Sequence, residues 1–162
     1  MTNSRRIGKD AERELCRLLD GQWRRISDGL VLCCKRSAIA GKRAEDAAHN
    51  MSGVHWEITR AGDIAAKWEQ AIDESMPGEV PVLWLRRPRR PWRVMLAIHR
   101  RWSSVRAVAA QMSTAAQLRC VQGHALIETD IPGAMVLLGW EQSPPSPKLR
   151  APGIALMLRQ LP

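Results

Sequence analysis

The spacing of apolar residues predicts two helices in the first half of the chain. In residues 8–20, Ala11, Leu15 and Leu18 form one stripe with the 3.6-residue period of a helix, and Gly21 follows its end. Residues 63–75 repeat this period, and the sequence MPG at 76–78 ends the second helix. The apolar face of this second helix carries Ile64, Trp68, Ala71, Ile72 and Ser75. Both helices therefore present one apolar side to a core.

Short apolar runs around these helices predict strands. We expect strands over residues 30–34, 54–58, 80–85 and 92–98, with a turn at 27–29 before the first of them. The basic, proline-containing sequence RRPRRP joins the last two strands. Since the elements follow one another as helix, strand, strand, helix, strand, strand, the pattern predicts an α/β fold with a mixed central sheet flanked by helices.

The composition of the chain changes after residue 102. Only five of the 25 Lys and Arg residues lie beyond that point. A helix rich in small residues is predicted over about 104–118, and the Pro-rich segment 143–153 is typical of an extended arm. The length of 162 residues suits one domain and a tail. We therefore expect a domain over 1–102 and a C-terminal helical or irregular extension over 103–162.

The charge balance indicates the class of partner. Twenty-five Lys and Arg residues against sixteen Asp and Glu residues give a net charge of +9 and an isoelectric point near 10.4. Such a balance favours a polyanion, with nucleic acid as the first candidate, although a basic protein whose charge only aids solubility has the same composition. The four cysteines lack the spacing of a zinc site, and no stretch has the pattern of a signal peptide or a membrane span. We expect a soluble cytoplasmic protein with reduced thiols.

Two glutamates stand out as candidates for chemistry. Glu12 lies beside the apolar stripe of the first helix, where the positions three, four and seven residues ahead offer it no cation. Glu57 lies inside the apolar strand VHWEI, where alternation puts His55, Glu57 and Thr59 on one face. Glu12 could instead be an exposed edge residue or an interhelical ion pair, and Glu57 could lie on a solvated outer face of the sheet.

The order of several short motifs indicates a family. The segments GKDAERELCRLL, a basic strand ending at Arg25, VHWEITR, a helix, EVPVLWLRR and PWRVMLAI follow one another over roughly residues 5–100. Together they resemble the archaeal-type and phage Holliday junction resolvases of the PD-(D/E)XK nuclease superfamily. The resemblance implies a restriction-endonuclease-like core and a Mg²⁺-dependent endonuclease, with Mn²⁺ possible, that cuts branched DNA. It also implies a homodimer, because two symmetric cuts resolve a junction.

The resemblance also implies a set of metal ligands. The family's first-helix glutamate matches Glu12, and the glutamate of its E-x-K strand motif matches Glu57. Its upstream metal-binding aspartate is matched best by Asp46, with Glu45 as second candidate and Asp28 as a looser one. In such a site the carboxylates would hold one or two Mg²⁺ ions, which generate the hydroxide that attacks the phosphodiester.

One position departs from the family pattern. Thr59 stands where the E-x-K motif has its lysine, so the cation that would orient the attacking water has to come from elsewhere. Arg60 points to the opposite face of the strand, whereas Lys67 lies at the edge of the second helix's apolar stripe and could lean over the strand or remain a surface lysine. This departure leaves open a degenerate member that binds DNA without cutting it. A third possibility is a phage-encoded inhibitor that binds an acidic protein surface.

The basic residues before residue 102 predict a DNA-binding surface. Residues 86–93, RRPRRPWR, hold five arginines and no acid, which suits phosphate contact through planar guanidinium groups, although a solvated hairpin tip has the same sequence. Trp92 could stack on a base or sugar. The residues predicted to contact DNA are Arg24, Arg25, Lys35, Arg36, Arg60, Arg86, Arg87, Arg89, Arg90 and Trp92.

Overall fold

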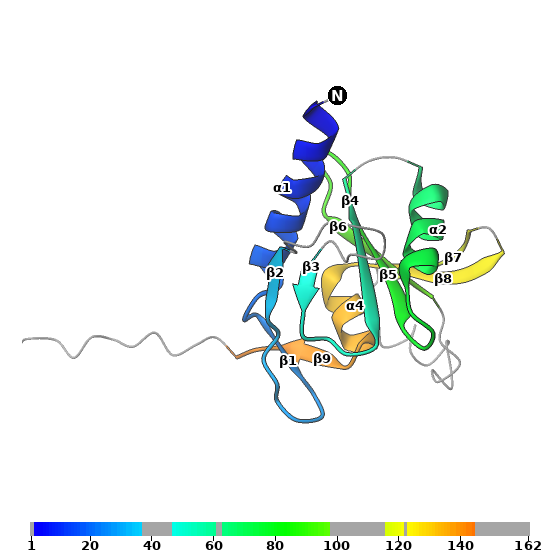
Figure 1. Ribbon diagram of the computed structural model, residues 1–162. Coiled ribbons are helices and arrows are strands. Elements are labelled where there is room, and N and C mark those ends of the chain that lie inside the picture. Colours follow the sequence, from blue (N-terminus) through cyan, green and yellow to red (C-terminus); the bar gives the residue numbers. More distant parts are fainter. Residues whose placement is uncertain (1, 37–46, 61–62, 98–115, 122, 145–162) are drawn as a thin grey trace, which may run out of the picture.

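A five-stranded mixed sheet forms the centre of the computed structural model, which describes residues 2–36, 47–60, 63–97, 116–121 and 123–144 (Figure 1). Its strands, in spatial order, are β4 (Val54–Thr59), β5 (Val80–Arg86), β6 (Trp92–Ala97), β8 (His124–Thr129) and β7 (Gln117–Val121). Strands β4 and β5 are parallel, and the remaining neighbours are antiparallel. The expected α/β class with a mixed central sheet is therefore confirmed.

Helices cover both faces of this sheet. Helix α1 (Thr2–Leu19) and helix α4 (Ile131–Leu137) pack on one face, where Leu15 and Met135 share a core with Trp56. Helix α2 (Ile64–Glu74) packs on the other face, where Trp68 meets Leu83 of β5 and neighbouring strands (Figure 1). Because β4 lies between the two layers, all six of its residues are buried. A polar side chain on β4 is therefore held inside the protein whichever way it points.

Two short antiparallel ribbons complete the layer on the α1 side. Strand β2 (Cys34–Arg36) pairs with β3 (Ala47–His49) beside α1. Strand β1 (Trp23–Arg25) pairs with β9 (Trp140–Gln142), so the segment that follows α1 lies beside the last described strand (Figure 1). The two predicted helices are present over α1 and α2, and the predicted strand over 30–34 is shifted, since β2 begins at Cys34.

The segment after residue 102 differs from the expected extension. Strands β7 and β8 belong to the central sheet, and α4 and β9 close the core on the α1 side. The helix expected over about 104–118 falls largely outside the described residues, and its last positions, Gln117 and Leu118, lie in β7. The predicted domain boundary at residue 102 therefore lies between β6 and β8, which are neighbours in one sheet. Most of the Pro-rich segment 143–153 also lies outside the described residues.

Replacing Gly133 by alanine is expected to lower the free energy of unfolding by about 1–3 kcal/mol. A Cβ at this position of α4 would lie 2.2 Å from Oγ1 of Thr129, which is fully buried, so helix and strand would have to move apart. Urea denaturation measures the loss. Gly8→Ala in α1 is the matched control, because a Cβ there meets nothing within 4 Å and alanine favours the helix; an equal loss in both variants would contradict this account.

Candidate nucleic-acid interface and a buried acid–base pair

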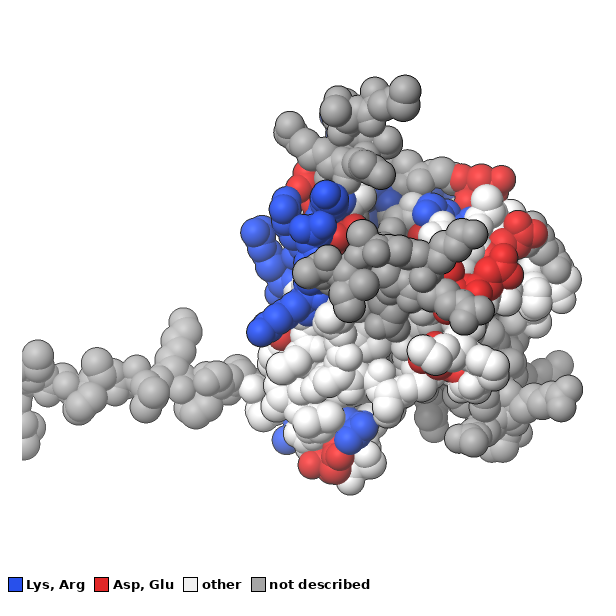
Figure 2. Space-filling model, viewed as in Figure 1, with Lys and Arg blue, Asp and Glu red and all other residues white. Residues whose placement is uncertain are grey.

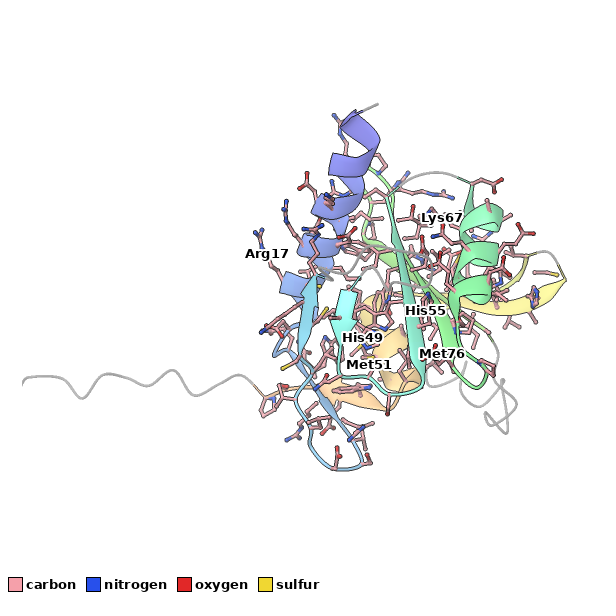
Figure 3. All side chains as sticks on the ribbon, viewed as in Figure 1. Arg17, His49, Met51, His55, Lys67 and Met76 are labelled. Carbon is pink, nitrogen blue, oxygen red and sulfur yellow. The ribbon has the colours of Figure 1, made fainter. Side chains whose placement is uncertain are left out.

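Glu57 of β4 and Lys67 of α2 form an ion pair inside the protein. The Nζ atom of Lys67 lies 2.7 Å from Oε1 of Glu57 and 2.8 Å from Oε1 of Gln70. Glu57 is only 2% exposed, so it does not lie on a solvated outer face of the sheet. Lys67 points from α2 toward β4 (Figure 3). The lysine therefore reaches over the strand, as its position on the helix predicts.

The pair belongs to a row of polar groups between β4 and α2. The Nε2 atom of Gln70 donates to Oε1 of Glu74 at 3.0 Å, and Oε2 of Glu74 lies 3.9 Å from Nε2 of His55. Both His55 and Thr59 are buried on the same strand as Glu57. Buried polar groups that are satisfied by one another fix the alignment of the elements that carry them. The hydrogen bond from Lys67 to Glu57 therefore fixes α2 against β4 at this point.

Glu12 lies on the opposite side of the sheet from Glu57. It extends from α1, whose apolar stripe packs against the Trp56 side of β4, and its Oε2 accepts a hydrogen bond from Nε of Arg36 at 2.8 Å. Successive side chains of a strand point to opposite faces, so Glu57 faces α2 instead. Asp46 and Glu45 lie outside the described residues. The structure thus pairs each of the two glutamates with its own cation and does not bring them together.

The described carboxylates do not form the expected metal ligand set. Within residues 2–36, 47–60, 63–97, 116–121 and 123–144, no group of three His, Cys, Asp or Glu side chains is arranged to hold a metal ion. Asp28, the looser candidate, is bound by Arg25, and this guanidinium lowers the pKa of the Asp28 carboxyl to about 2. Glu12 and Glu57, which lie on different faces, therefore do not fit a shared Mg²⁺ site.

Glu14, which the sequence does not single out, ties α1 to the ends of two strands. Its Oε2 lies 2.5 Å from Nη2 of Arg60, and its Oε1 lies 2.9 Å from Nη1 of Arg86 and 3.4 Å from Nε1 of Trp92. Arg86 also lies over the Trp92 ring, 5.7 Å from its centroid. Trp92 is 4% exposed, so stacking on a base would require it to leave the core. Three residues predicted to contact DNA are therefore engaged with this carboxylate or the core.

Glu14→Gln is expected to lower the free energy of unfolding by about 1–2 kcal/mol, because it removes the charge that two arginines share while keeping the side chain's shape. Chemical denaturation of the full chain measures the change. Glu141→Gln is the matched control: its partner Arg24 lies in a more exposed pair, for which we expect a loss within about 0.5 kcal/mol. A larger loss for the control would contradict the importance of the Glu14 contacts.

A basic face covers α1 and β2. Lys9, Arg13 and Arg17 are exposed at intervals of four residues along α1, and Lys35 and Arg36 are exposed on the neighbouring β2. Lys and Arg side chains gather over these two elements (Figure 2), and Arg17 extends away from the helix (Figure 3). Three carboxylates are interspersed: Asp10 pairs with Arg13, Glu12 pairs with Arg36, and Asp20 at the end of α1 accepts a hydrogen bond from the backbone N–H of Cys34 in β2. We call these five cations the α1–β2 basic face.

The sequence predicts only part of this face. Lys35 and Arg36 are among the predicted DNA contacts, whereas Lys9, Arg13 and Arg17 are not. Their spacing of four residues was a usable signal, because residues four apart lie on the same side of a helix. Arg24 and Arg25 lie on β1 and pair with Glu141 and Asp28. These two arginines are therefore partly neutralised and belong to another part of the surface.

The β5–β6 loop adds three more cations. Arg87, Arg89 and Arg90 are exposed, and among the described residues no carboxylate pairs with any of them. Arg89 adopts a φ of 58°, in the left-handed region that turns the chain sharply. The loop begins directly after Arg86, which contacts Glu14 of α1. The exposed arginines therefore extend from the end of the sheet that meets α1.

Comparisons with known proteins do not assign the chain to a family. No family model, no curated protein and no solved structure matches the chain significantly. None of the described helices is long and apolar enough to cross a bilayer. The resemblance to the resolvases and the activity it implies therefore remain predictions from the motifs.

Proposed function

We propose that the protein binds DNA through the phosphate backbone without cleaving it, using the α1–β2 basic face. The single observation that carries this proposal is the gathering of five exposed cations on two adjacent elements, where they outnumber the three neighbouring carboxylates of Asp10, Glu12 and Asp20 (Figure 2). The excess of Lys and Arg over the whole chain points the same way. Guanidinium and ammonium groups in such numbers favour a polyanion, because each phosphate they neutralise releases bound counterions.

The geometry of α1 suits a repeating row of phosphates. A helix rises 1.5 Å per residue, so the cations of Lys9, Arg13 and Arg17 are spread over about 12 Å along one side of the helix. Lys35 and Arg36 widen the row sideways, because β2 lies against α1. This arrangement supports backbone contact, which positions a duplex without reading its sequence.

Metal-dependent cleavage is the second candidate, and one observation favours it. Lys67 reaches Glu57, so a cation stands beside the strand glutamate although Thr59 occupies the lysine position of the motif. The resemblance implies a cation that orients the attacking water, and Lys67 is the candidate for it. The separation of Glu12 from Glu57 weighs against this candidate, which is why DNA binding without cleavage is our first proposal.

Binding and cleavage can be tested in one experiment. The full-length protein is titrated into a labelled four-way junction and a labelled linear duplex, first in EDTA for affinity and then in Mg²⁺ or Mn²⁺ for cleavage. We expect salt-sensitive binding and intact DNA in both metals. Failure to bind either DNA would contradict the proposal. Cleavage that Glu57→Gln abolishes while binding is kept would establish the second candidate instead.

The preferred form of DNA and the oligomeric state are part of the same proposal. We propose that branched DNA is bound at least as tightly as linear duplex, and that the protein acts as a homodimer, as the resemblance implies. Sedimentation of the free protein and of its junction complex measures both stoichiometries. A monomer, or a protein that binds the junction more weakly than the linear duplex, would leave backbone binding intact and contradict this part.

A further inference from the structure

A cavity of about 680 Å³ lies on the α2 side of the sheet, away from the α1–β2 basic face. It is bounded by the N-terminal end of α2, the β5–β6 loop and the β7–β8 hairpin. Its size falls within the range of pockets that hold small ligands. No residue of the α1–β2 basic face lines it. The cavity therefore needs an explanation separate from backbone binding.

The charge of the cavity wall favours an anion. Four arginines line it, and Glu128 is the one acidic residue among the lining residues. Arg93 and Arg119 share the single Glu128 carboxylate, at 3.1 Å and 2.8 Å, so one of their two positive charges is offset. Arg87 and Arg90 line the cavity from the β5–β6 loop and have no carboxylate partner among the described residues. Two guanidinium groups on one wall suit the oxygens of a phosphate.

The remaining wall favours an apolar body. Ile64 of α2, Leu85 and Met95 of the sheet and Val121 of β7 line the cavity together with the arginines. An inorganic ion would leave this apolar surface in contact with water, whereas a ligand with a planar ring would cover it. The ligand chemistry that matches both parts of the wall is a phosphate joined to a ring system.

We propose that this cavity binds a nucleoside monophosphate, with its phosphate held by Arg87 and Arg90 and its base against Ile64, Leu85 and Met95. The ligand has two sources, a free nucleotide or the 5′-terminal nucleotide of a DNA strand. This inference goes beyond the proposed function, since it concerns another face and requires no contact with the α1–β2 basic face.

The chain contains its own reporter for the cavity. Cys120 is exposed and lines the cavity, whereas Cys33 is exposed next to β2 and does not. The rate of alkylation of both cysteines by iodoacetamide is measured by mass spectrometry in the full-length protein. We expect dAMP at ten times its dissociation constant to slow alkylation of Cys120 about tenfold and to leave Cys33 unchanged. Deoxyadenosine and inorganic phosphate at the same concentration should each protect Cys120 far less.

Variants and DNA ends complete the test. Arg87→Ala/Arg90→Ala should remove the protection of Cys120 by dAMP, while Arg13→Ala/Arg17→Ala on the other face should keep it. A 5′-phosphorylated oligonucleotide that protects Cys120 better than its 5′-hydroxyl counterpart identifies the DNA end as a source. Unchanged alkylation of Cys120 at millimolar dAMP, or full protection in the Arg87/Arg90 variant, would overturn the inference. Binding of linear duplex DNA is measured with the same preparation. If the duplex is bound but dAMP does not protect Cys120, the nucleotide-binding inference fails while the proposed DNA binding stands.

A different observation concerns the two buried cysteines beneath the basic face. The sulfur atoms of Cys16 in α1 and Cys34 in β2 lie 2.8 Å apart, and both residues are buried. The Cys34 thiol donates to the Cys16 sulfur, which lowers the pKa of Cys16. The sequence predicts reduced thiols without the spacing of a zinc site and does not indicate which of them lie together. The structure brings Cys16 and Cys34 into contact as free thiols.

The geometry points to a disulfide between Cys16 and Cys34 that forms with hydrogen peroxide. The Cys16 sulfur attacks one peroxide oxygen and breaks the O–O bond, which gives a sulfenic acid and one water. The Cys34 sulfur then displaces the hydroxyl, which leaves as a second water with the Cys34 proton. Two thiols thus lose two hydrogens, and one peroxide is reduced to two waters. The new bond would join the two elements of the α1–β2 basic face.

Peptide mapping under non-reducing conditions tests this second inference. After peroxide treatment we expect a linked Cys16–Cys34 peptide lighter by two hydrogen atoms and a thermal midpoint raised by several degrees, because the link restricts the unfolded chain. Cys34→Ser should abolish both effects, whereas Cys120→Ser should abolish neither. Full alkylation of Cys16 and Cys34 after peroxide treatment and unfolding would overturn the inference.

Discussion

Simultaneous charge reversal of Lys9, Arg13 and Arg17 to glutamate is expected to weaken binding of linear duplex DNA by about 10²- to 10³-fold near physiological salt. Each reversal removes one phosphate contact and adds repulsion at an exposed position of α1. Fluorescence anisotropy with labelled duplex measures the affinity, and a salt series should give a slope of log K against log salt that is smaller by about 3.

Arg24→Glu/Arg25→Glu is the control for this reversal. Both arginines already pair with a carboxylate on another part of the surface, and the double variant lowers the net charge by four, against six for the α1 variant. We expect less than about tenfold weakening, because long-range effects of exposed charges are screened by salt. If the control weakens binding as much as the α1 variant does, the affinity follows net charge and not the basic face.

Lys67→Met is expected to lower the free energy of unfolding by about 2–4 kcal/mol. The substitution keeps the apolar part of the side chain but leaves the Glu57 carboxylate, 2% exposed, without the ammonium group 2.7 Å away. The Lys67 side chain is 35% exposed, so water can reach part of the site and we place the loss below that of a fully buried pair. Urea denaturation followed by circular dichroism measures it.

The double variant Glu57→Gln/Lys67→Met shows whether the loss comes from the uncompensated charge. Glutamine has the shape of glutamate without its charge, so we expect the double variant to be more stable than Lys67→Met alone. A double variant that is less stable than Lys67→Met would show that Glu57 is stabilised by its other neighbours and that Lys67 adds little. Either result also bears on the second candidate function, metal-dependent cleavage, because it measures the coupling free energy between Glu57 and Lys67.

The sequence predicts the features that depend on local spacing. The alternation in residues 54–58 identifies the strand whose Glu57 faces away from Trp56, and the helical period of residues 63–75 places Lys67 where it can reach that glutamate. Both inferences follow from periods of two and 3.6 residues, which the backbone imposes on any sequence. They therefore hold without knowledge of the rest of the fold.

The features that depend on distant segments could not be predicted in the same way. Glu14 is 46 residues from Arg60 in sequence, and the two meet only because the ends of β4 and β5 lie beside α1. The resemblance to the resolvases predicts that Glu12 and Glu57 share a site, but the face on which each one lies depends on how α1 packs on the sheet. Four of the five residues of β7 are exposed, and the fifth is half-buried. The strand therefore does not need the alternation of apolar and polar residues by which a half-buried strand is recognised in a sequence. For this reason its residues could be taken for the end of a helix.

Lysine acetylation in the presence and absence of DNA tests most directly where the nucleic acid lies. Saturating duplex should slow the modification of Lys9 and Lys35, on the α1–β2 basic face, by about tenfold and leave Lys67, on the α2 side of the sheet, at its rate in the free protein. Protection of Lys67 without protection of Lys9 and Lys35 would place the DNA over the Glu57–Lys67 pair and contradict binding by the basic face.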